Sequence, residues 1–233
     1  MNELIQSISL RGIVHLEHFR NDKKILDKIV PNIITDAGLA LISGLILTDV
    51  VVDDCDEIAI GIGGIGGTAD SGNVGGTTTV DTERTEINDY WNSATITYVT
   101  GSNMGVTRAI TDFDAVADTI THTAFANQVV AGDQYKLSAR PVSTALESEI
   151  TTGGGARRTA ADVVGTRVTT TVTNDTAQLV TTFTFTAAFN VDESGVFNAA
   201  AAGNMLCATA FGDIPVISGD TIQITWQVVS SKG

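Results

Sequence analysis

The sequence predicts an all-β fold, an antiparallel β-sandwich with one short helix near residues 36–47 and an inserted β subdomain. Two observations lead to this class. In the C-terminal part of the chain, short segments of alternating apolar and polar residues meet at Gly and Asn turns, which is typical of strands with one buried face. Apolar residues recur at helical spacing in a single segment. The 233 residues are enough to bury a substantial core.

The composition of the chain indicates which kinds of partner to expect: nucleic acid, other protein chains or a membrane. The formal net charge is −14, which disfavours a nucleic-acid partner because such binding needs clustered Lys and Arg side chains. Only 17% of residues are charged and the mean hydropathy is +0.19, so we expect other chains to cover part of the surface. The start of the chain lacks a secretory signal pattern, and the longest apolar run, Leu39–Leu47, is too short to span a bilayer. We therefore expect a cytoplasmic product with no membrane partner.

The N-terminal part predicts a hairpin followed by the helix. Residues 7–19 and 24–30 form two strands around Asn21–Asp22, a turn pair that tolerates left-handed backbone. Thr35 caps the helix. The apolar positions that give this segment its helical spacing are Leu39, Ile42, Leu45 and Ile46.

The middle of the chain predicts a strand, a glycine loop and an insertion. Branched apolar and small residues alternate over residues 58–62 and then give way to glycines. A loop as long as residues 66–141 is improbable inside a compact domain. We therefore expect residues 1–65 and 142–233 to form the main sandwich, and 66–141 to form an inserted β subdomain or extended loop region. Its strand-like pieces are residues 95–100, 119–125 and 134–139.

The C-terminal part has the clearest pattern. Residues 167–173 pair with 178–186 across Asn174–Asp175, and residues 205–211 and 221–229 complete the sheet. In the last strand, the side chains expected on one buried face are Ile222, Ile224, Trp226 and Val228.

Two patterns raise the question of a cofactor or redox site. Gly61–Gly66 fits G-x-G-x-x-G after a strand, but a dinucleotide fingerprint needs a helix at the third glycine, and Gly67–Asn73 cannot form one. We expect a flexible loop and no cofactor. Cys55 and Cys207 are too few for a disulfide framework and too far apart in the sequence for a metal site, so we expect two small buried hydrophobic side chains.

Candidate metal ligands are sparse. The acidic loop Asp53–Glu57 offers oxygens for calcium, but EF-hand spacing and its central glycine are absent. A solvated acidic loop is the commoner explanation, and the choice stays open. His15 and His18 are an odd number of residues apart on a strand, so their side chains point to opposite faces and cannot share a metal ion. No metal site is expected.

No catalytic residues are expected either. The chain lacks a G-x-S-x-G nucleophile turn, and with 27 acidic residues a pair of carboxylates has no diagnostic value. Arg157–Arg158 follow glycines, and in an acidic protein we expect them in interface salt bridges rather than in an anion clamp. An enzyme such as a depolymerase is kept only as a minor alternative.

Four residues carry specific structural or binding hypotheses. Glu193 and Asp220 each lie near a glycine, and we expect both to staple turns by accepting backbone N–H hydrogen bonds. Tyr90 and Trp91 stand among Asn and Asp residues in the insertion, a mixture that suits sugar stacking, so they form a possible exposed binding tip.

The order of four stretches resembles a family of short virion proteins of tailed bacteriophages and related viruses, described as tail, tail-fibre or head-surface proteins. The stretches are Pro31–Leu39, Ile58–Gly63, Thr144–Ile150 followed by Arg157, and Asn174–Trp226. The resemblance implies a β-rich, non-enzymatic, usually oligomeric particle component, and it transfers no catalytic residues. The chain departs from the family pattern at residues 66–141, which separate stretches expected to be nearly contiguous in smaller relatives.

Together these observations favour a structural protein of a tailed virus particle that is made in the host cytoplasm and located in the virion. We expect a homo-oligomer, with a trimer favoured, on the head surface as a decoration protein or at the neck or tail, in contact with capsid or tail components. If the opening hairpin docks on the particle, removal of residues 1–30 is expected to leave a folded protein that is no longer incorporated. The alternative is a receptor- or glycan-binding adhesin that uses Tyr90 and Trp91.

Overall fold

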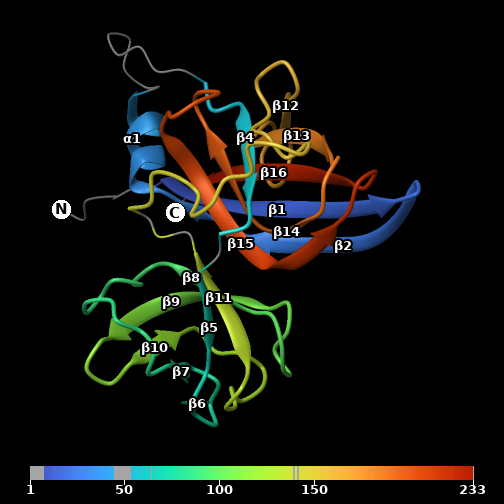
Figure 1. The fold of residues 1–233 in the computed structure, drawn as a ribbon. Coiled ribbons are helices and arrows are strands. Elements are labelled where there is room, and N and C mark those ends of the chain that lie inside the picture. The colour runs from blue at the N-terminus through green and yellow to red at the C-terminus, as the bar shows by residue number, and fades with distance from the viewer. Residues whose placement is uncertain (1–7, 45–53, 64, 139, 141, 233) are drawn as a thin grey trace, which may run out of the picture.

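A computed structural model describes residues 8–44, 54–63, 65–138, 140 and 142–232. The chain forms an antiparallel β-sandwich with a second β body beneath it, and the first and last strands lie side by side (Figure 1). The predicted all-β class with one short helix is confirmed.

The first sheet of the sandwich has five strands in the order β12-β13-β16-β1-β2. Its strands are β1 (Ile8–Arg20), β2 (Lys23–Pro31), β12 (Val164–Val168), β13 (Thr176–Thr184) and β16 (Thr221–Lys232). Asn21 and Asp22 both have positive φ, and they close the predicted hairpin between β1 and β2. The β12–β13 hairpin is also present, with its first strand three residues earlier than predicted.

The second sheet has four strands in the order β3-β15-β14-β4. Its strands are β3 (Ile33–Ile34), β4 (Glu57–Gly61), β14 (Phe189–Phe197) and β15 (Met205–Val216). Helix α1 (Asp36–Gly44) covers one end of the sandwich, and the last predicted helical residues, 45–47, lie outside the described part of the chain.

The two sheets enclose the main apolar core because period-2 alternation turns one face of each strand inward. Fully buried members from both sheets include Leu16, Ile60, Phe183, Phe211 and Trp226. The last strand alternates as predicted as far as Trp226. Val228 is only partly buried and packs at the margin of the core.

The second body is a seven-stranded sheet in the order β5-β11-β8-β9-β10-β7-β6, formed within residues 65–138. Its strands are β5 (Ile65–Thr68), β6 (Ser71–Gly72), β7 (Thr78–Val80), β8 (Thr95–Tyr98), β9 (Thr107–Asp114), β10 (Thr119–His122) and β11 (Gln134–Ser138). It has an apolar core of its own, with Tyr98, Phe113 and Tyr135 among the largest buried side chains.

The expectation that residues 1–30 can be removed without loss of the fold is wrong, and docking by the hairpin itself stays a prediction. β1 is an interior strand that pairs with β16 from Ile8 to Phe19, and Val14 and Leu16 are fully buried in the core. Removal of residues 1–30 would therefore take away an interior strand of the sandwich. A folded remainder is not expected.

Candidate functional site

Parts of all four stretches that carry the family resemblance meet in the structure on the four-stranded sheet, while Asn174–Trp226 also contributes β13 and part of β16 to the five-stranded sheet. The segment around Ser148 bonds to β4, where the Ile62 amide donates to the Ser148 carbonyl (2.9 Å) and the Ile150 amide donates to the Ile60 carbonyl (2.9 Å). β4 in turn pairs with β14 of the C-terminal stretch. These contacts place Glu193 of β14 at the centre of the cluster.

Glu193 ties the loop to the sheet. Its carboxylate accepts hydrogen bonds from the backbone amides of Glu147 (3.1 Å) and Ser148 (2.9 Å). A glycine is needed beside it, because a Cβ on Gly61 would lie 2.2 Å from Glu193 Oε1. The end of the strand Glu57–Gly61 therefore has to be small for the carboxylate to reach the loop.

The predicted turn position of Glu193 is wrong. The residue lies inside β14, paired with Ala210 on one side and Gly61 on the other, and Gly195 is a strand residue as well. Glu193 does accept backbone amides, but they come from another segment of the chain. Burial raises the pKa of its carboxyl to about 7, against the lowering effect of the two amide donors.

Arg157 closes the same cluster from the other side. It forms a bidentate ion pair with Glu149, its guanidinium donates to the carbonyls of Ala199 and Ala202 (2.8 Å each), and it lies 3.8 Å from the centroid of the Phe197 ring. Arg157 therefore joins the loop to the end of β14 within one chain. The interface salt bridge that the sequence predicted for it is an intramolecular one.

The helical stretch is fixed to the same sheet. The Thr35 hydroxyl accepts the Gly38 amide (2.9 Å) as the predicted helix cap, and it donates to the Met205 carbonyl at the start of β15. A Cβ on Gly38 would lie 2.1 Å from the Leu206 carbonyl oxygen. Only glycine allows the helix this close to the strand.

Asp220 does lie at a turn, between β15 and β16. Its carboxylate accepts from the Ile217 amide (3.0 Å), the Arg20 guanidinium (2.7 Å) and His18 Nε2 (3.0 Å). Gly219 beside it has φ +92°. The Arg20 hydrogen bonds hold the pKa of the Asp220 carboxyl well below its usual range, against the effect of burial. The site staples the turn to the β1–β2 end of the sheet.

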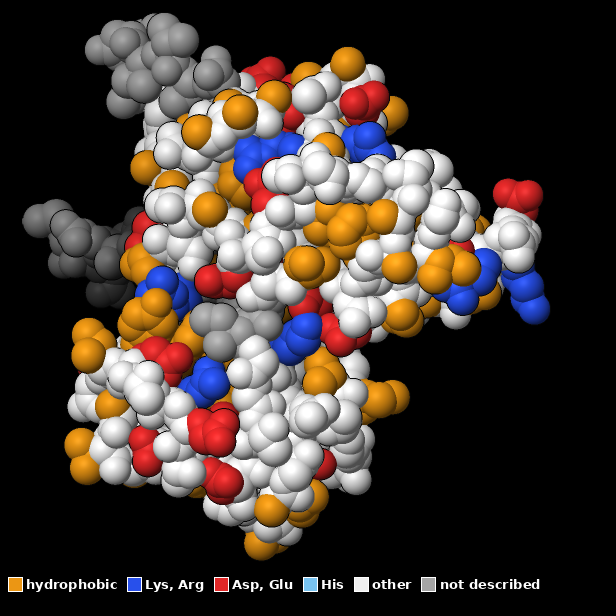
Figure 2. All heavy atoms as spheres, viewed as in Figure 1, with side chains coloured by type: hydrophobic (Ala, Val, Ile, Leu, Met, Phe, Trp, Pro, Cys, Tyr) orange, Lys and Arg blue, Asp and Glu red, His pale blue; other side chains and the backbone are white. Residues whose placement is uncertain are grey.

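A third buried carboxylate lies where the two bodies join. Lys136 of β11 forms ion pairs with Asp192 of β14 and with Asp213 of β15 (2.6 Å), and Asp192 has no exposed side-chain surface. The paired carboxylates raise the Lys136 pKa, against the opposing effect of burial, which is the largest influence on it. Positively and negatively charged side chains lie on the surface where the two bodies join (Figure 2).

Sequence reasoning missed this junction because its three residues come from separate segments. The one signal available was the lysine in the alternating strand Gln134–Ser138. It stands at a polar position of the strand, where a lysine usually faces solvent.

The predicted exposure of Trp91 is wrong. Its ring has no exposed surface and belongs to the core of the second body. Tyr90 is half-buried, packed edge-on against Trp91 with the Arg140 guanidinium 4.1 Å from the centroid of its own ring. The polar neighbours that suggested a tip instead form a turn, in which the Asn92 side chain donates to Asp89 (2.8 Å). An aromatic platform for sugars is absent from this part of the described chain.

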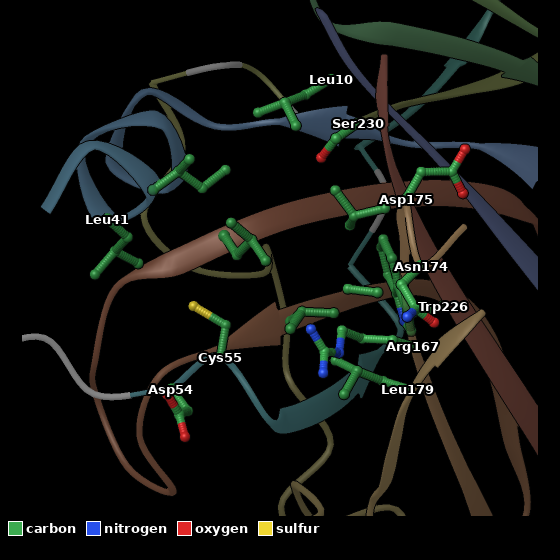
Figure 3. Close-up of a pocket in the computed structure, with 15 residues that line it drawn as sticks. Leu10, Leu41, Asp54, Cys55, Arg167, Asn174, Asp175, Leu179, Trp226 and Ser230 are labelled. Atoms are coloured by element: carbon green, nitrogen blue, oxygen red, sulfur yellow. The ribbon is translucent and has the colours of Figure 1, made fainter. Parts of the chain in front are cut away.

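A cavity of about 360 Å³ opens at the end of the sandwich near α1 (Figure 3). Its walls are mainly apolar and include Trp226 and Leu179. Burial, with smaller contributions from the Asp56 and Asp54 carboxylates, raises the pKa of the Cys55 thiol to about 11. The thiol is therefore protonated at neutral pH and a poor nucleophile. Cys207 is fully buried, and both cysteines are free.

The glycine motif does not take the geometry that a dinucleotide needs. β4 ends at Gly61 and the next described element, beginning at Ile65, is strand β5. A pyrophosphate is held by the amides at a helix N-terminus, and no helix follows the motif within the described residues.

The structure describes several of the residues considered as metal ligands. In the acidic loop, Asp53 lies outside the described residues and Glu57 is buried at the start of β4. Among the described residues, one group of three side chains brings potential metal-ligand atoms within 4.8 Å of one another. Its members are His15, Glu17 and Asp27. The Lys24 ammonium binds the carboxylates of Glu17 (3.0 Å) and Asp27 (2.5 Å), so the positive charge between them comes from this side chain. His18 points to the opposite face, as its spacing from His15 predicts.

Comparison of the chain with protein-family models, curated proteins and solved structures finds no match. Within the described residues, the structure contains no helix of sufficient length and hydropathy to cross a membrane.

Proposed function

We propose that the chain is a non-enzymatic structural component of a tailed virus particle, assembled as a homo-oligomer on the head surface or at the neck or tail. The observation that carries the proposal is the convergence of the four resembling stretches. They are far apart in the sequence, yet parts of all four belong to the four-stranded sheet or to the loop and helix packed on it, joined through Glu193, Arg157 and Thr35. The stretch Asn174–Trp226 also supplies β13 and part of β16 to the five-stranded sheet. Contact among the four stretches supports the proposal, because motifs that define one family are expected to belong to one structural unit.

The chemistry of the described residues supports a structural role. Three of the most buried carboxylates, at Glu193, Asp220 and Asp192, bind amides or cations of their own chain. The cavity near α1 has mainly apolar walls and a protonated thiol. These groups stabilise the fold, and a net charge of −14 keeps such a protein soluble at high local concentration.

The adhesin alternative loses its main support because Trp91 is buried. The proposal that remains is tested on particles. Mass spectrometry of gradient-purified virions should detect the chain at a copy number fixed relative to the major capsid or tail protein, while an abundant host cytoplasmic protein is lost during purification. Absence of the chain from particles that remain infectious would contradict the proposal.

A further inference from the structure

Among the described residues, nothing covers one large surface of the sandwich. In β1, Val14 and Leu16 face the core, so Ile13, His15 and Glu17 point away from it. Cross-strand pairing extends this outward set over all five strands. We call it the outer face, and its members are Val164, Gln178, Val180, Thr182, Gln223, Thr225, Gln227, Ile13, His15, Glu17, Lys24, Asp27 and Ile29.

The outer face is unusually poor in net charge for this chain. Its Lys24 binds both Glu17 (3.0 Å) and Asp27 (2.5 Å), and His15 Nε2 lies 2.7 Å from Asp27 Oδ1. With His15 neutral, one lysine and two carboxylates sum to −1 (1 − 2) at one side of the face, and exposed Arg11, which points outward from β1 like Ile13, offsets that charge. The other members are Thr, Gln, Val and Ile, while the whole chain carries −14. Copies of so acidic a protein repel each other, and a nearly neutral face is where they can approach.

Apolar side chains are exposed on this face. Ile29 is 65% exposed, Val164 is 63% exposed and Ile13 is 37% exposed. They lie on both sides of the central strand β16, with Val164 beside uncharged residues and with Ile13 and Ile29 beside the charged group of Glu17 and Asp27. Apolar groups with the charged residues confined to one side fit the composition of protein interfaces, where charge is depleted at the centre.

The size of the face also fits a partner. Five strands spaced about 4.8 Å apart, with about eight residues each at about 3.3 Å per residue, give an area of about 600 Å². A specific interface buries roughly 800 Å² on each partner, and side chains at the rim add to the flat area. A sheet of this size packs face to face against another sheet.

We propose that the outer face binds the outer face of a second copy of this chain about a two-fold axis near Thr225. β16 is the central strand of the five, and Thr225 is paired with Val180 on one side and with His15 on the other. A two-fold contact places the same patch on both partners, so an uncharged centre meets an uncharged centre. This inference rests on the homo-oligomer of the proposed function and assigns its contact surface, and it proposes a two-fold dimer in place of the trimer favoured from the sequence.

The test is the molar mass of the full chain by sedimentation velocity and light scattering. The wild-type chain of 24.3 kDa is expected at about twice that mass. Val180→Asp and Thr225→Lys each place like charges against each other across the axis, so each variant is expected to be a monomer. An equimolar mixture of the two variants is expected to regain the dimer mass, because Asp then faces Lys. Val116→Asp, at a side chain 91% exposed in the second body, is the matched control and keeps the dimer.

The outcomes separate the two proposals. A monomeric wild-type chain would overturn the inference, and so would a dimer or trimer whose mass neither face variant changes. Circular dichroism and thermal unfolding establish that the variants are folded. Absence from particles would count against the proposed function, whereas unchanged masses of the variants would count against this face alone.

Discussion

Substitution of Glu193 by Gln should change how stability depends on pH. The side chain is 2% exposed and bonds to two amides of the loop. Burial raises its pKa from an ordinary value of 4.5 to about 7. The folded chain therefore holds a proton that the unfolded chain has released between these pH values. The contribution to stability is complete below about pH 4.5 and is lost as pH rises to about 7.

The magnitude follows from the width of this pH window. A difference of about 2.5 in pKa, at about 1.4 kcal/mol for each pH unit, corresponds to about 3 kcal/mol. The amide in Glu193→Gln has no proton to release, so the variant lacks this contribution. Burial lowers the pKa of His122, which gives a slope of opposite sign. Because His122 is present in both proteins, its effect cancels in their difference.

The assay is urea unfolding of the wild-type chain and of Glu193→Gln between about pH 4 and about pH 8. The free energy of unfolding of the wild type minus that of the variant should fall by about 3 kcal/mol across this range. Glu83→Gln, at an exposed position of the second body, is the control and should show a nearly constant difference. A constant difference for Glu193→Gln would refute the assignment of a buried, proton-holding carboxyl.

Three further substitutions test the other buried groups by urea unfolding. Asp220→Ala should lower the free energy of unfolding by about 1–3 kcal/mol, because its three donors lose their acceptor, whereas exposed Asp112→Ala should change it by less than about 0.5 kcal/mol. Equal stability of both variants would contradict the staple. Lys136→Met removes a cation from buried Asp192 and should cost about 3–5 kcal/mol, and addition of Asp192→Asn should recover part of the loss. No recovery would argue against charge as the cause. Trp91→Ala should cost about 3–5 kcal/mol because it empties a fully buried site, and an unchanged stability would contradict core packing.

Elements that depend only on neighbouring residues could be predicted from local patterns in the sequence. Alternation of polarity and the Asn21–Asp22 pair are enough to define the first hairpin, because both turn residues adopt the left-handed backbone that the turn needs. Thr35 likewise caps the helix through its own side chain and an amide three residues later. These features depend on neighbours within a few residues.

Features that depend on distant segments were not predictable in the same way. The exposed or buried state of Trp91 is decided by the other strands of the second body, which its polar neighbours do not reveal. Glu193 lies near Gly195 in the sequence, but its partners, Glu147 and Ser148, belong to a different segment. β1 is an interior strand only because the C-terminal strand returns to pair with it. Long-range pairing of this kind leaves little local signal.

The most direct test of the central claim is antibody-labelled electron microscopy of purified virus particles, followed by cryo-electron microscopy of the labelled region. The account predicts label at regular positions on the head, neck or tail, and density there that fits a β-sandwich with a second β body. Particles that carry no label and no such density would contradict the claim that this chain is a structural component of the virion.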